Sequence, residues 1–102
     1  MAFTGHEDHT ITLTDGAALT KEFRRIFPNQ PKGYFFSRDT LESILALSDC
    51  VGIRFYFGSD DAGNLKLVFV GATEDENDIL EIVGDNGNLC PPACGQSNSL
   101  NS

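Results

Sequence analysis

The sequence predicts an α+β protein in which two N-terminal helices pack on an antiparallel β-meander of about three strands. Apolar residues recur at helical spacing in the first half of the chain and alternate with a period of two in the second half. The chain has 102 residues and a hydrophobic fraction of 40%, which suffices for one small core. Helices that precede a run of strands indicate segregated elements, with the helices on the apolar face of the sheet.

The first helix is expected between Thr14, a candidate N-cap, and Pro28, which cannot continue a helix. A short strand is expected just before it, at residues 10–13, where polar and apolar residues alternate. The apolar stripe of this helix is formed by Leu19, Phe23, Ile26 and Phe27.

The second helix is expected after Ser37 or Asp39, since both are candidate N-caps and Asp39 with Glu42 matches the capping box. It is expected to end at residues 48–49. Between the two helices, residues 34–36 form a short apolar run that is expected to be extended.

Three strands are expected in the second half. Residues 51–58 alternate between two faces and residues 65–70 follow a turn-rich loop, so together they predict a β-hairpin. Residues 79–83 are the third strand candidate. The inward positions of helices and strands predict one shared core, formed by Leu19, Phe23, Leu41, Ile44, Phe55 and Phe69.

The expected organisation is a flexible N-terminus at residues 1–9, a single α+β domain at residues 10–89 and a Cys- and Pro-containing tail at residues 90–102. The longest apolar runs are far shorter than the roughly 20 residues of a membrane span. The first fifteen residues have neither a basic start nor an apolar stretch, so no secretory signal is predicted. These features together predict a cytoplasmic protein that does not engage a membrane.

The net charge of −8 is concentrated in the second half of the chain. Residues 1–58 hold seven acidic and six basic residues, whereas residues 59–102 hold eight acidic residues and one basic residue, Lys66. Nucleic-acid binders present basic footprints to the phosphate backbone, so this balance argues against a nucleic-acid partner.

Cys90 and Cys94 flank two prolines and an alanine and are the sharpest local feature. A polyproline II conformation would hold their Cα atoms about 12 Å apart, whereas a disulfide needs about 4.4–6.8 Å. The sequence therefore favours two unbridged thiols. A labile disulfide that would require a turn, and a metal site, remain alternatives. In the metal alternative His6 and His9 complete a Cys₂His₂ ligand set, although their spacing fits zinc patterns poorly.

A candidate binding surface lies on the second face of the predicted hairpin. Arg54 and Tyr56 point away from the expected core there, and Val68 or Val70 join them on the neighbouring strand. An arginine and a tyrosine on a partly apolar face suit a protein interface or a homodimer. The alternative is that both side chains merely lie over an exposed sheet face.

Several segments together resemble a family of small uncharacterised bacterial proteins. They are CVGIRFYFG at residues 50–58, LKLVFVG at residues 65–71, NDIL at residues 77–80 and CPPAC at residues 90–94. The resemblance covers about residues 14–100. It implies a bacterial origin, but no activity, ligand or functional residue, because the family has none assigned.

No catalytic motif of the nucleophile-elbow, Walker A or H-E-x-x-H type is present, and the HEDH run is one residue short of the last. The predicted function is therefore a small non-enzymatic domain that binds another protein or itself, with no cofactor. The alternative is a small-ligand or metal-binding protein that uses Cys90 and Cys94. A small enzyme is the weaker third hypothesis.

Overall fold

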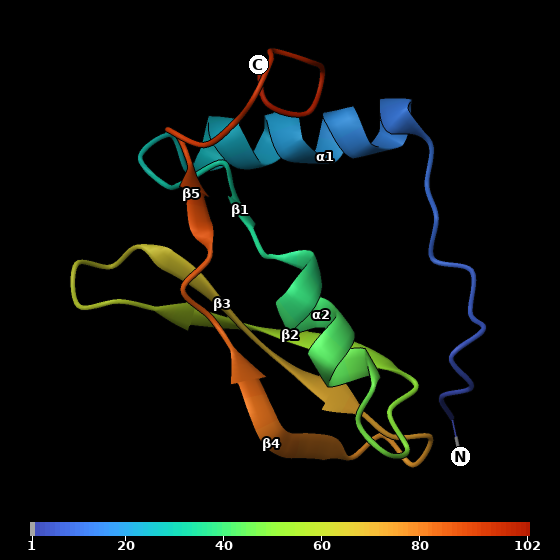
Figure 1. Cartoon of the computed structure of the whole chain (residues 1–102). Coiled ribbons are helices and arrows are strands. Elements are labelled where there is room, and N and C mark those ends of the chain that lie inside the picture. Colours follow the sequence, from blue (N-terminus) through green and yellow to red (C-terminus); the bar gives the residue numbers. More distant parts are fainter. Residues whose placement is uncertain (1) are drawn as a thin grey trace. The chain divides into compact units, whose positions relative to one another are not determined.

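The computed structural model describes residues 2–102. In chain order its elements are α1 (Leu13–Ile26), β1 (Gly33–Phe35), α2 (Arg38–Leu45), β2 (Gly52–Ser59), β3 (Leu65–Ala72), β4 (Asp78–Gly84) and β5 (Asn88–Cys90), shown in Figure 1. The α+β class is confirmed. The expectation of two N-terminal helices before one meander was wrong in detail, because β1 lies between the helices and β1 and β5 form a second sheet.

The described residues form two compact units that interleave in the sequence. We call residues 2–8 and 36–87 the meander unit, and residues 9–35 and 88–102 the tail unit. The predicted division into a flexible terminus, one domain and a tail concerns mobility and independent folding, and it stays a prediction. Among residues 2–102, neither helix has the length and apolar character that crossing a bilayer requires.

The meander unit contains an antiparallel sheet of order β2-β3-β4, which confirms the predicted hairpin and its third strand. β2 and β3 pair along their whole length, from Gly52 opposite Ala72 to Ser59 opposite Leu65. The pairing of β3 with β4 is less regular, because its register shifts between Phe69 and Gly71.

One face of this sheet is covered by α2, which contacts all three strands. Ile44 of α2 and Phe69 of β3 are both fully buried between the helix and the sheet. The helix approaches closely because residue 71 is glycine: a Cβ there would lie 2.8 Å from Sγ of Cys50 and 3.2 Å from Cγ2 of Ile44. On the neighbouring strand, Gly84 leaves room for the Phe69 ring, which lies directly over it.

The predicted core is correct only in part. Ile44 and Phe69 are buried as expected, but Leu19 is 66% exposed and Phe55 is 46% exposed. Phe55 still contacts the core, since its ring centroid lies 5.2 Å from that of Phe69. Leu19 belongs to the tail unit and Ile44 to the meander unit, so the two helices lie in different compact units. Helical periodicity identified an amphipathic face but not the element that covers it.

In the tail unit, α1 begins two residues earlier than expected. Its N-cap is Thr12, whose Oγ1 accepts a hydrogen bond from the Asp15 N–H at 3.1 Å, so the prediction of Thr14 was wrong. The strand expected at residues 10–13 is absent, because this segment supplies the cap and first residue of α1. The expected extended segment at residues 34–36 is confirmed for residues 34 and 35, which belong to β1, and β1 pairs antiparallel with β5, with Gly33 opposite Cys90.

Candidate functional site

A cluster of three polar side chains connects the two outer strands of the meander sheet. Nη1 of Arg54 lies 2.5 Å from Oδ1 of Asp78, and the Tyr56 hydroxyl donates to Oδ2 of Asp78 at 2.5 Å. Arg54 and Tyr56 belong to β2 and Asp78 begins β4, so these contacts cross the central strand β3. Nη1 of Arg54 also donates to the backbone carbonyl of Glu76 at 3.2 Å.

The electrostatics of this cluster favour a structural connection over proton transfer. The Tyr56 hydroxyl, with the Arg54 guanidinium beside it, lowers the pKa of the Asp78 carboxyl below its ordinary value. Asp78 is therefore charged at neutral pH, and both of its oxygens already accept a hydrogen bond. A general acid or base needs a pKa close to the working pH, so Asp78 is poorly suited to that role.

The four residues of the predicted binding surface do share one face of the sheet. The register sets Arg54 opposite Val70 and Tyr56 opposite Val68. Val70 is only 3% exposed, because the cluster spans β3 above it. A partner on this face would therefore contact Tyr56 and Val68. Whether this face binds anything stays a prediction.

The N-terminal segment adds to the same cluster. The Arg54 guanidinium lies 5.5 Å from the centroid of the Phe3 ring, within range of a cation–π interaction. The Phe3 N–H donates to the Glu74 carbonyl at 3.2 Å, which holds the segment against the turn before β4. Sequence reasoning missed both Phe3 and Asp78, since the pairing of β3 with β4 decides which residues come opposite Arg54.

A second feature is the outer edge of β2, which has no neighbouring strand in the meander sheet. On this strand the Phe57 side chain is 82% exposed, whereas Phe55, which contacts Phe69, is 46% exposed. The physical reason is length, because the eight residues of α2 span about 12 Å, whereas the eight residues of β2 span about 26 Å. Comparing the expected helix and strand lengths would have shown this from the sequence.

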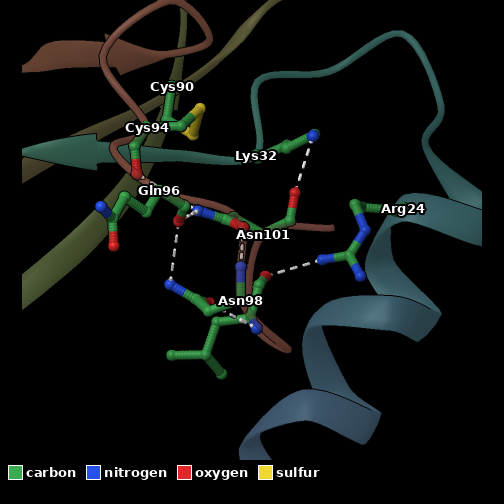
Figure 2. The surroundings of a disulfide bond; sticks show 8 residues. Arg24, Lys32, Cys90, Cys94, Gln96, Asn98 and Asn101 are labelled. Carbon is green, nitrogen blue, oxygen red and sulfur yellow. Dashed lines mark hydrogen bonds between the residues drawn. A yellow bond between two sulfur atoms is a disulfide. The ribbon is translucent and has the colours of Figure 1, made fainter.

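Cys90 and Cys94 are joined by a disulfide, with their Cα atoms 4.7 Å apart (Figure 2). The prediction of two unbridged thiols was therefore wrong, because it was based on an extended conformation between the two cysteines. The chain instead turns, with the Ala93 N–H donating to the Leu89 carbonyl at 2.8 Å and the Cys94 N–H donating to the Pro92 carbonyl at 3.0 Å.

The bridge bears directly on the metal alternative. The two sulfurs are bonded to each other and so are not thiolate ligands in this state. His6 and His9 are both exposed. Within residues 2–102, no group of three or more His, Cys, Asp or Glu side chains has the arrangement to hold a metal ion.

Cys50 is the remaining cysteine and is a half-buried thiol. Its Sγ donates to the Gly52 carbonyl at 3.2 Å, and it borders an open cleft of about 540 Å³. The other lining residues are mostly polar: Asp49, Val51, Thr73, Glu74, Asp75 and Asn77. None of them is a histidine or a basic residue, the groups that most often stabilise a thiolate beside a cysteine.

Comparison of the chain with known protein families, curated proteins and solved structures finds no match. These comparisons therefore add no function to the site, and the resemblance to a bacterial family stays a prediction.

Proposed function

We propose that this protein is a non-enzymatic, self-associating domain in which β2 pairs with β2 of a second copy. The observation that supports this most strongly is an eight-residue edge strand with Phe57 82% exposed at its outer end. The edge of a sheet presents unpaired N–H and C=O groups that can extend the sheet with another strand. Edge strands that stay single usually carry prolines or inward-pointing charges, and β2 has neither device beyond Arg54.

The choice of a second copy follows from the strand's charge and pattern. Its one ionisable group besides the tyrosine hydroxyl is Arg54, and Asp78 already neutralises it. Such a strand offers little to attract a charged partner. When two copies of it pair in a suitable register, no like charges lie opposite each other. Symmetric pairing about a two-fold axis is the commonest way for identical chains to associate.

A register centred on Tyr56 illustrates the complementarity. It sets Phe57 of each copy opposite Phe55 of the other, and Arg54 opposite Gly58. Two cross-strand aromatic pairs form in this way, each contributing about 0.2–1 kcal/mol. The net charge of −8 on each copy opposes this association, so a weak dimer that tightens with added salt is expected.

Sedimentation equilibrium over a range of protein concentrations tests the proposal. The parent protein should approach twice its 11.1 kDa mass at high concentration. Phe57→Lys should weaken association about ten-fold, since it removes both aromatic pairs and places a charge at the interface. Leu80→Lys is the matched control, because Leu80 is 71% exposed and lies on β4, at the opposite edge of the same sheet.

Two results would contradict the proposal. One is a parent protein that stays monomeric at millimolar concentration. The other is a dimer that Leu80→Lys disrupts and Phe57→Lys does not, which would assign the interface to β4 instead.

A further inference from the structure

We propose that the Cys90–Cys94 disulfide is a redox switch that controls whether the C-terminal segment, residues 95–102, stays bound to the tail unit. This inference is independent of the β2 interface, because it uses different residues and a different unit. It rests on where the bridge lies, on how the segment is held and on what reduction would remove.

The disulfide connects the β1–β5 sheet to the start of this C-terminal segment. Cys90 is the last residue of β5, and its carbonyl accepts a hydrogen bond from the Lys32 N–H at 2.7 Å. Cys94 directly precedes the segment, and its carbonyl accepts from Nδ2 of Asn101 at 3.2 Å. The bridge therefore joins a residue anchored in the sheet to the first residue that contacts the folded segment.

Two cations hold the far end of the segment through three consecutive carbonyls. Arg24 of α1 donates to the carbonyl of Leu100 at 2.7 Å and to that of Ser102 at 3.1 Å. Nζ of Lys32 donates to the carbonyl of Asn101 at 2.7 Å. All three bonds are exposed, so water competes for the same donors and acceptors and the net contribution of each bond is small.

The segment contributes little else to its own binding. It contains one apolar side chain, Leu100, which lies beside Gly16 of α1 and is 43% exposed. Its internal turn depends on Asn98, whose Oδ1 accepts from the Leu100 N–H at 2.8 Å. A short polar segment with so little buried area depends on its point of attachment to stay ordered.

Reduction breaks this crosslink in a balanced exchange with a dithiol, while the peptide chain through residues 91–93 stays intact. One thiolate of the dithiol attacks a sulfur of the bridge and forms a mixed disulfide, and its second thiol then displaces the protein sulfur. Two electrons and two protons pass to Cys90 and Cys94, and the dithiol becomes a disulfide. Access is open, since both cysteines are only half-buried and the intervening residues 91–93 are exposed.

The size of the effect follows from the loop. The bridged cysteines are separated by only four positions, so the entropic constraint amounts to about 30-fold in the equilibrium for closing the turn. In the reduced protein the turn retains its two backbone hydrogen bonds, but residues 95–102 gain freedom and dissociate more often from Arg24 and Lys32. A constraint of this size suits a disulfide that regulates the segment reversibly better than one on which the whole fold depends.

Amide exchange measured by NMR on the full chain, before and after treatment with dithiothreitol, tests the switch. Reduction should speed exchange of the Asn101 and Ser102 amides roughly 10- to 30-fold, and should leave β3 unchanged. Alkylation without reductant should label one thiol and alkylation after reduction three, because Cys50 is free and the other two are bridged.

Three variants complete the experiment. The double substitution Cys90→Ser/Cys94→Ser should show the fast exchange with and without dithiothreitol, whereas Cys50→Ser should respond as the parent protein does. Arg24→Gln should speed exchange of the same amides without changing the number of labelled thiols. The proposal fails if three thiols are labelled in the unreduced protein, or if reduction of the parent protein leaves the exchange of residues 95–102 unchanged. The second arm needs no variant, so misfolding of the double substitution would not obscure the answer.

Discussion

Replacing Gly84 by alanine inserts a methyl group where the ring of Phe69 lies. A Cβ on residue 84 would overlap three ring atoms of Phe69, and even the farthest of them, Cε1, is 2.7 Å away. The ring has no free direction of movement, since Phe69 is 0% exposed and its centroid lies 4.6 Å from that of Phe36 and 5.2 Å from that of Phe55. Overpacking of this kind costs about 1–3 kcal/mol, and the confined ring places Gly84→Ala at the upper end.

Urea unfolding followed by circular dichroism measures this cost, and amide exchange in β3 assigns it to the meander unit. Gly52→Ala is the matched control, because a Cβ at residue 52 meets no atom within 4 Å. It should leave the free energy of unfolding unchanged or raise it by up to about 1 kcal/mol. Against a typical total of about 5–15 kcal/mol, the difference between the two variants is readily measured.

A double-mutant cycle with Phe69→Leu isolates the proposed overlap. The smaller side chain should relieve part of the cost of Gly84→Ala, with a coupling energy of about 0.5–3 kcal/mol. Equal urea midpoints for Gly84→Ala and Gly52→Ala, or a cycle without coupling, would refute the close packing of Phe69 on β4.

Three further predictions concern the meander unit. Ile44→Ala should lower the free energy of unfolding by about 2–5 kcal/mol, because Ile44 is fully buried between α2 and the sheet, and equilibrium urea unfolding checks this. Ser37→Ala should lower it by about 0.5–2 kcal/mol, because Oγ of Ser37 accepts from the Thr40 N–H at 3.2 Å at the start of α2, whereas Ser43→Ala on the exposed face of that helix should not. The lowered pKa of Asp78 means that its contribution to stability is present above the ordinary carboxyl pKa near 3.8 and is lost as the pH falls through the lower folded-state pKa. Asp78→Asn should therefore flatten the dependence of the urea midpoint on pH in the acid range. Part of the dependence should remain, because hydrogen bonds also lower the pKa of Asp60 and Glu7. An unchanged dependence would argue against the cluster with Arg54 and Tyr56.

Local signals in the sequence were sufficient for the elements with strong periodicity. Strict alternation predicted β2 and its hairpin with β3, and the candidate N-cap Ser37 was found at the start of α2. The three-residue strands β1 and β5 were harder, because so short a segment carries no measurable alternation. The predicted surface residues also fell on one face, since side-chain direction in a strand has a period of two.

Contacts between distant residues were decided by the tertiary structure alone. The register of β4 against β3 brings Asp78 within reach of Arg54 and Tyr56, and that register includes an irregularity no local pattern announces. The turn at residues 90–94 brings two sulfurs together where proline content suggested an extended chain. A short α2 leaves Phe57 uncovered, although its pattern matches that of buried Phe69. Local sequence determines which way a side chain points, because the backbone period is local, whereas what lies opposite it depends on pairing and coverage by segments far away in the chain.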